Sequence, residues 1–190
     1  MSISLVYDTE TTGFFSNLPL GDPSQPCVVQ LAFQLYEDKK LIMSFKTLIK
    51  PEFFNSIPRE ATNVHGITYE DCVKFGIPIK EAFRVFYYGF KKCDVIVAHN
   101  ISYDTKAMKS TLLKLKAPDD FIADFENKKQ YCTMMNAINV LKLPRGRGSG
   151  YKYPNLNECV EYFFKRSVVG AHDSMVDCQE CANVYFRLIE

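Results

Sequence analysis

Three β-rich runs come before the first helical pattern in this chain, and this order constrains the fold more than any other feature of the sequence. Ile3 to Tyr7 is a short apolar run that ends at Asp8. Two further runs, Cys27 to Tyr36 and Leu41 to Ile49, lie on either side of the charged turn from Glu37 to Lys40. Because β-branched and aromatic residues are frequent in these runs, we expect three strands, the last two joined as a hairpin.

The remainder of the chain alternates between helical and extended patterns. Apolar residues recur at helical spacing from about Pro78 to Lys92, and Asp94 to Ala98 is a short run typical of a buried strand. Further helices are expected over Tyr103 to Leu115, Cys132 to Val140, Asn155 to Phe164 and Asp173 to Ile189, with a loop from Pro144 to Pro154. Three strands followed by such an alternation predict an α/β fold, in which helices cover the faces of a mixed sheet.

Length and composition limit the classes of protein that remain. A chain of 190 residues fits one compact domain, 1–190. Lysine plus arginine (23) nearly balance aspartate plus glutamate (22), so any attraction to a polyanion must be local. The seven cysteines are scattered without a disulfide-like rhythm and no secretory signal precedes them, which indicates a reducing, intracellular, cytoplasmic location. Because no apolar run approaches the roughly 20 residues that cross a bilayer, we expect no membrane span.

Acidic residues and one histidine in three separated motifs carry the chemistry. Asp8 and Glu10 lie in YDTETTG, Asp104 lies in VAHNISYD, and His172 and Asp177 lie in AHDSMVD. Two-residue spacing on a strand points the first two carboxylates to the same side, where they can share a cation. Magnesium prefers oxygen ligands and is usually held by one or two carboxylates, so this pair suits a metal that works in phosphoryl transfer.

The other two motifs complete a site of the same kind. Asp104 is expected at the start of a helix, where the helix dipole favours a carboxylate near other acids, and there it can hold a second cation. Asp177 is expected in the first turns of the last helix, and His172 on the loop before it. An imidazole, with an ordinary pKa of about 6.5, can accept a proton from a metal-bound water. Two cations about 4 Å apart would activate that water and stabilise the leaving oxygen at phosphorus.

Taken in order, DTETTG, HNxxxD and HDxxxD resemble the three motifs of the DnaQ-like, DEDDh 3′–5′ exonucleases, a family that includes the proofreading subunit of bacterial replicative polymerases. The segments IPREATNVHGIT and YPNLNECVEYF are also similar to family landmarks. The resemblance implies a ribonuclease H-like fold with a five-stranded mixed sheet flanked by helices, two Mg²⁺ or Mn²⁺ ions, and hydrolysis from a 3′ end that releases nucleoside 5′-monophosphates. The resemblance also implies that His172 is the general base and that the metal ligands are Asp8, Glu10, Asp104 and Asp177.

The same resemblance assigns substrate contacts to Thr9, Thr11, Thr12, Phe14, His65 and Asn100. Stacking of Phe14 on the last base would contribute about 1–3 kcal/mol, as in other single-strand binders. The span from Phe14 to Gln25 is longer than the link usual in the family. His65 has an alternative role as a cap of the local backbone, and we expect His99 to be a structural, hydrogen-bonded histidine rather than the general base.

Two further features leave alternatives open. The expected loop before the penultimate helix carries four cations beside flexible glycines: Lys142, Arg145, Arg147 and Lys152. They either hold the phosphates of an incoming strand or lie on a solvated loop, and we favour Arg145 and Arg147 as substrate contacts. Cys178 and Cys181 have the spacing of half a zinc site. They fall in an expected helix, however, and the sequence has no second pair of cysteines at this spacing, so buried cysteines are the better interpretation.

The favoured function is a metal-dependent 3′–5′ exonuclease acting on DNA. The alternatives are an exoribonuclease that trims RNA ends and a catalytically silent nucleic-acid-binding module. The sequence does not distinguish DNA from RNA as the substrate. The expected partner is nucleic acid with a free 3′ end, and a polymerase or repair protein is a candidate second partner. Because the chain ends at Glu190, directly after the last expected helix, we expect a stand-alone or separately recruited nuclease. Its oligomeric state stays open.

Overall fold

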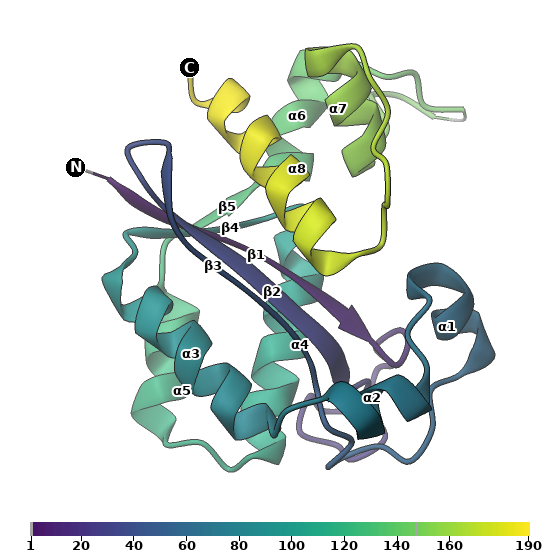
Figure 1. The fold of residues 1–190 in the computed structure, drawn as a ribbon. Coiled ribbons are helices and arrows are strands. Elements are labelled where there is room, and N and C mark those ends of the chain that lie inside the picture. The colour runs from purple at the N-terminus through teal and green to yellow at the C-terminus, as the bar shows by residue number, and fades with distance from the viewer. Residues whose placement is uncertain (1, 147) are drawn as a thin grey trace.

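A five-stranded sheet in the order β3-β2-β1-β4-β5 forms the centre of the computed structural model, which describes residues 2–146 and 148–190 (Figure 1). The strands are β1 (Ile3–Thr11), β2 (Val28–Glu37), β3 (Lys40–Leu48), β4 (Val95–Ala98) and β5 (Gln130–Cys132). β2 pairs antiparallel with β1 and β3, whereas β4 is parallel to β1 and β5. The expected α/β fold with a five-stranded mixed sheet is confirmed.

Helices cover both faces of this sheet. They are α1 (Arg59–His65), α2 (Tyr69–Phe75), α3 (Ile79–Lys92), α4 (Ile101–Lys114), α5 (Asp119–Asn127), α6 (Thr133–Leu141), α7 (Leu156–Phe164) and α8 (Ser174–Leu188). Figure 1 shows α3, α4 and α5 on one face and α8 on the other, with α6 and α7 beside α8. α1 and α2 lie near the end of the sheet where β1 finishes. That end is therefore bordered by helices from distant parts of the chain.

Alternation along β1 divides its side chains between two cores. Tyr7 belongs to the core shared with α3 and α4, whereas Val6 belongs to the core shared with α8, and both are fully buried. Since successive side chains of a strand point to opposite faces, Asp8 and Glu10 continue the α8 face. The intervening threonines continue the α4 face. The sheet therefore presents the two acids to α8, as their spacing predicts.

β1 also runs past its parallel neighbour. β4 pairs only with the segment from Ser4 to Val6, so the later residues of β1 have a free edge on that side. The first turn of α4, which begins directly after Asn100, lies against this edge and bonds to it. Side chains from β1 and α4 therefore meet beyond the end of β4.

Periodicity did not predict α1, α2, α5 or β5, all of which are short. α1 has no buried residue, so it has no apolar stripe that a sequence pattern would show. α2 is fixed at its start by a capping box between Thr68 and Asp71. The five helices that were expected begin and end within two residues of their predicted bounds. Among the described residues, no helix has both the length and the apolar character needed to span a bilayer.

Candidate active site

The first and third motifs meet at the end of β1, on the face that α8 covers. Asp8 and Glu10 are both partly buried there. α8 begins at Ser174, and its first turn carries Asp177 to the same place. A ring nitrogen of His172 and carboxylate oxygens of Glu10 and Asp177 all lie within 4.8 Å of one another. Residues separated by most of the chain therefore form one cluster.

Asp104 approaches this cluster from the free edge of β1. It lies in the first turn of α4 and is buried. Its Oδ1 atom accepts a hydrogen bond from the backbone N–H of Thr9 at 3.0 Å and another from the Thr9 hydroxyl at 2.8 Å. Hydrogen bonds to an ionised carboxylate are among the stronger ones in proteins, so they fix the orientation of this side chain. Thr9 therefore positions this acid with both its backbone N–H and its hydroxyl.

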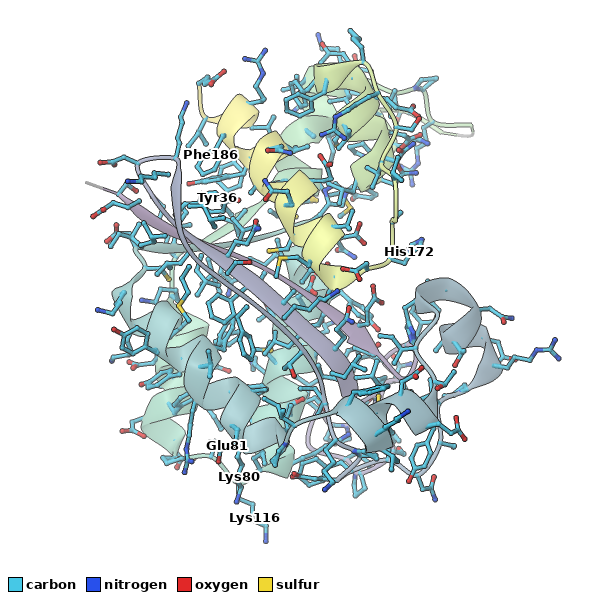
Figure 2. All side chains as sticks on the ribbon, viewed as in Figure 1. Tyr36, Lys80, Glu81, Lys116, His172 and Phe186 are labelled. Carbon is cyan, nitrogen blue, oxygen red and sulfur yellow. The ribbon has the colours of Figure 1, made fainter. Side chains whose placement is uncertain are left out.

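His172 lies on the loop before α8 and has an unusual backbone conformation. Its φ angle is 67°, in the left-handed region that residues other than glycine rarely adopt. Its backbone N–H donates to Asp177 Oδ2 at 3.0 Å, which ties the loop to the first turn of α8. The side chain is exposed, and Figure 2 places it between α1 and the α7–α8 connection. The imidazole is thus accessible while its backbone is held.

Side chains from β2 and β3 hold the residues that follow His172. Lys46 of β3 donates to Asp173 at 2.7 Å. Gln30 of β2 accepts from the backbone N–H and the hydroxyl of Ser174 at 3.0 and 2.6 Å. Asp173 in turn caps α8 by accepting from two backbone N–H groups. Sequence reasoning missed Lys46 and Gln30, because only the fold brings β2 and β3 to the start of α8.

Burial and mutual repulsion raise the pKa of all four clustered carboxyl groups. Burial is the largest cause for Glu10, whose pKa rises to about 8 with further contributions from Asp177 and Asp104. Burial also raises the pKa of Asp104 to about 7, although its hydrogen bonds from Thr9 oppose the rise. The pKa values of Asp8 and Asp177 are raised as well, again chiefly by burial. In the absence of a cation, each carboxylate therefore disfavours ionisation of the others.

The cluster has the chemistry of a divalent-cation site. Within the part of the chain that the structure describes, no lysine or arginine forms an ion pair with any of its acids, Asp8, Glu10, Asp104 and Asp177. Carboxylate oxygens are the ligands that Mg²⁺ and Mn²⁺ prefer, and a cation among them would relieve their repulsion. The donor set therefore fits divalent metal ions.

A cavity of about 560 Å³ adjoins the acids. Its lining includes the end of β1 and the residues that follow it, from Thr9 to Gly13, the exposed Phe14, and Val64 and His65 of α1. Glu10 borders both the cavity and the acidic cluster. A molecule held in the cavity would therefore lie next to the carboxylates.

Three threonines line this cavity, Thr9, Thr11 and Thr12, and each uses its hydroxyl within the protein. Thr9 holds Asp104, as described above. The hydroxyl of Thr11 lies 2.6 Å from that of Tyr103, and the hydroxyl of Thr12 accepts from the backbone N–H of Cys27 at 3.0 Å. These residues line the wall of the cavity, so the substrate contacts predicted for them stay a prediction.

Tyr103 is a cavity residue that sequence reasoning did not identify. Its hydroxyl donates to the carbonyl of Gly13 at 2.7 Å, and its ring meets Phe14 and Phe15 edge-on. Phe14 itself is 92% exposed, so it stands free at the rim of the cavity. Tyr103 comes directly before Asp104 in the second motif, and this position is the sequence signal that would have identified it.

His65 and Asn100 have distinct surroundings. His65 Nδ1 accepts from the backbone N–H of Ile67 at 3.0 Å, and Nε2 lies 3.3 Å from the carbonyl oxygen of Thr11. The backbone contact that was considered for His65 is therefore present, while its ring also lines the cavity. Asn100 is exposed at the start of α4 with a left-handed φ of 64°, and its side-chain oxygen accepts from Ser102.

His99 and the two cysteines of α8 are structural. Both ring nitrogens of His99 are hydrogen-bonded, to Thr133 at 2.9 Å and to the carbonyl of Pro154 at 3.0 Å, and burial lowers its pKa to about 4. Cys178 and Cys181 are buried and free, and Cys178 bonds to a backbone carbonyl of β1 at 3.0 Å. The structural interpretations of this histidine and of these cysteines are confirmed.

Three of the four cations of the loop between α6 and α7 lie within the described residues. Lys152 forms an ion pair with Glu158 of α7, so this cation has a protein partner. Arg145 is exposed. Arg147, the other predicted substrate contact of the loop, lies outside the described residues. The loop stands beyond α6 and α7, on the side of the molecule where His172 lies (Figures 1 and 2).

Solved structures share this fold at low sequence identity. Exonuclease I matches all of the chain with a TM-score of 0.75 and 18% identity, and the chain covers 41% of that protein. Exonuclease X matches 98% of the chain with a TM-score of 0.63 and 21% identity, and 90% of that protein is covered. The sheet order and these matches show the ribonuclease H-like fold, as expected.

Sequence comparison is more specific. The family model RNase_T, described as an exonuclease, matches residues 5–185, so the chain belongs to this exonuclease family. The uncharacterized exonuclease CP81 of Escherichia phage 186 is 32% identical over 177 residues, which are 90% of this chain and 80% of that protein. A PolC-type DNA polymerase III of Caldanaerobacter subterraneus subsp. tengcongensis is 26% identical over 187 residues, which are 98% of this chain but 11% of the polymerase. The predicted DnaQ-like membership is confirmed.

Proposed function

We propose that this chain is a single DEDDh exonuclease domain, residues 1–190, that removes nucleoside 5′-monophosphates from the 3′ end of DNA. The observation that carries the proposal is the convergence of Glu10, His172 and Asp177 within 4.8 Å, beside a cavity of about 560 Å³. Asp8 and Asp104 repel Glu10 and each other electrically and so belong to the same acidic cluster. Acids, an accessible imidazole and an adjoining pocket are the parts that hydrolysis of a phosphodiester needs.

Two Mg²⁺ or Mn²⁺ ions would be held by the acids of the cluster, Asp8, Glu10, Asp104 and Asp177. When bound, such a pair of ions makes a water more acidic and stabilises charge on the attacking and leaving oxygens. The protein's own contribution is to fix the ligands. Thr9 orients Asp104 with two hydrogen bonds, and the backbone N–H of His172 orients Asp177.

His172 is proposed as the general base. Its ring makes no hydrogen bond to other residues within the described ranges, so a nitrogen can accept the proton of the attacking water. Lys46 and Gln30 hold the residues that follow His172, which limits how far the imidazole can move.

Cleavage at an end is supported by the cavity next to the acids. Its walls come from the loop after β1 and from α1, and they leave room for a terminal nucleotide with Phe14 beside its base. The backbone and side chains of Thr11, Thr12, His65 and Tyr103 complete the proposed pocket. Asn100 and Arg145 are proposed to contact the strand outside the pocket, and Arg147 keeps the same predicted role.

DNA is the proposed substrate because of the proteins that this chain resembles. Escherichia coli exonuclease I has been solved with a dT13 oligonucleotide, and exonuclease X with 5′ overhanging duplex DNA. The relatives also include PolC-type DNA polymerases III. On the same grounds, we propose that a polymerase or a repair protein supplies the 3′ ends on which this chain acts.

The test uses two single-stranded oligonucleotides of the same sequence, one labelled at its 3′-terminal nucleotide and the other at its 5′ end. With Mg²⁺ or Mn²⁺, the 3′ label should be released at once as a mononucleotide, while the 5′-labelled strand shortens step by step. A matched RNA strand should be degraded more slowly. Immediate release of the 5′ label, or no release with any divalent ion, would overturn the proposal.

A further inference from the structure

The loop between α6 and α7 (described residues 142–146 and 148–155) is called the arm below. We propose that Tyr151 and Tyr153, on this arm, form a stacking platform for unpaired bases upstream of the 3′-terminal nucleotide. The preferred substrate is therefore a single strand of several nucleotides. This inference rests on the proposed function, since it requires a strand whose 3′ end lies at the acidic cluster.

Both tyrosines are exposed, although the neighbouring side chains are ion-paired or buried. Tyr151 is 42% and Tyr153 is 59% exposed. Lys152, between them, pairs with Glu158 of α7, and the following Pro154 is buried. Exposure therefore alternates along the arm as it does in an extended segment, which places the two rings on the same side. Aromatic rings presented in this way, next to cations, are the elements of sequence-independent single-strand binding.

Backbone hydrogen bonds join the two halves of the arm where it leaves α6. Pro144 and Tyr151 form an antiparallel bridge. The backbone N–H of Lys152 donates to the carbonyl of Leu143 at 3.1 Å. These contacts hold the returning half of the arm against the end of α6, so the tyrosines are presented on an ordered support. A platform that is already ordered loses less conformational entropy when it binds a strand.

The arm is also attached directly beside the second motif. The carbonyl of Pro154 accepts from His99 Nε2 at 3.0 Å. His99 lies at the end of β4, immediately before the exposed Asn100, and α4 then carries Asp104 into the acidic cluster. Tyr153 is thus one residue away from a direct contact with the motif that supplies a metal ligand.

The cavity and the arm are built by different elements. α1 and the loop after β1 line the cavity, whereas the arm is attached at the end of β4. In the figures His172 lies between α1 and the α6–α7 connection, both of which border the same side of the molecule (Figures 1 and 2). A strand whose last nucleotide fills the cavity and whose next phosphate lies at the acids therefore continues toward the arm.

Charge on the arm is consistent with this path. Lys142 and Arg145 are exposed at its start, where they can contact the phosphates of a strand whose bases stack on the tyrosines. A fully paired duplex hides the faces of its bases, so it would gain the phosphate contacts but not the stacking. The platform therefore favours a single strand over a blunt duplex.

The experiment compares the double variant Y151A/Y153A with Y151F/Y153F and with the control Tyr88→Ala, a 61% exposed tyrosine on α3. Steady-state kinetics are measured on a dT12 single strand and on the dinucleotide dTpdT, which is too short to reach the arm. Since stacking contributes about 1–3 kcal/mol per base, the alanine pair should raise KM for dT12 about 10–100-fold. Its kcat, and its kcat/KM on dTpdT, should stay within about twofold of the wild type, and the phenylalanine pair and the control should behave like the wild type.

An equal loss on dTpdT and dT12, an unchanged KM for dT12, or equal use of single strand and blunt duplex by the wild type would each overturn the platform. Fluorescence anisotropy of labelled dT12 in Ca²⁺ separates the platform from the proposed function. If the wild type releases no nucleotide at all, weaker binding by the alanine pair still supports the platform, and equal binding still overturns it. Circular dichroism melting confirms that each variant is folded.

Discussion

Two regions meet at the candidate active site, and they are supported in different ways. The strand–helix side consists of the end of β1 and the first turn of α4. There Asp104 is buried and receives two hydrogen bonds from Thr9. The loop side is the connection that leads into α8, where His172 is exposed and its backbone is left-handed. Asp8, Glu10 and Asp104, three of the four clustered acids, are on the first side, and the group that would exchange a proton is on the second, next to Asp177 of α8.

This difference shows how one fold separates two requirements of metal-dependent hydrolysis. Ligands must be held within a narrow geometry, which a strand and a packed helix provide. A general base needs access to water, which a loop provides. The loop side is nevertheless restrained, by the Lys46–Asp173 pair and the hydrogen bonds between Gln30 and Ser174. The following variants test this separation.

The largest effect is expected from Asp8→Asn on the strand–helix side. Loss of a metal ligand should lower kcat at least about 10³-fold. Folding raises the pKa of Asp8, so the folded state holds this proton more tightly than the unfolded state, and stability falls as the pH rises above the ordinary pKa of the group. Removing the charge should therefore raise the Tm of the metal-free protein at pH 8. Retained turnover, or a lower Tm in EDTA, would contradict this.

On the loop side, His172→Ala should slow hydrolysis by about 10²–10⁴-fold, the usual range for an acid–base group. Part of the loss should be recovered as the pH rises, because hydroxide can then replace the base. KM should change little, since the cavity is lined by other residues. The pH profiles of kcat for the variant and the wild type provide the measurement. Profiles of the same height and shape would remove His172 from the mechanism.

A smaller effect is expected from Thr9→Val, which removes one of the two hydrogen bonds to Asp104 and keeps the side-chain shape. A hydrogen bond to a charged group contributes about 1.5–3 kcal/mol, so kcat should fall by about 10–100-fold. Thr9→Ser, which keeps the hydroxyl, should restore it. If the valine and serine variants are equally active, Thr9 does not position Asp104.

The smallest effect concerns the scaffold and appears in stability rather than in activity. Burial lowers the pKa of His99 from 6.5 to about 4, so the folded state binds fewer protons than the unfolded state between these values. The stability contributed by neutral His99 is therefore complete above about pH 6.5 and is lost as the pH falls toward 4, by roughly 3 kcal/mol. His99→Gln should flatten this dependence. Urea unfolding across that pH range is the measurement, and an unchanged slope would contradict the assignment.

Much of the fold follows from local sequence patterns, and the exceptions have a common cause. β1 to β4 and the helices α3, α4, α6, α7 and α8 were predicted from the spacing of their apolar residues. β5 has three residues and no buried one, and α1 buries nothing. Such elements are set by their neighbours in space, which a local pattern does not contain.

The candidate site divides in the same way. The acids and His172 were found because they lie in compact motifs whose residue types have few other uses together. The hydrogen bonds that support them were missed, because each bond joins residues far apart in the sequence. Lys46 bonds to Asp173, and Thr9 bonds to Asp104. The predicted contacts of Thr11 and Thr12 took no account of hydrogen bonds to Tyr103 and Cys27 that only the folded chain makes.

The central claim is that acids from three motifs act as one divalent-cation site, and counting bound Mn²⁺ by electron paramagnetic resonance tests it most directly. Wild-type protein at pH 8 with a nucleoside 5′-monophosphate should bind two Mn²⁺ ions per chain. Asp8→Asn and Asp104→Asn should each bind fewer, whereas Glu70→Gln, an exposed acid at the start of α2, should bind two. Unchanged binding in both aspartate variants, or no binding by the wild type, would contradict the claim.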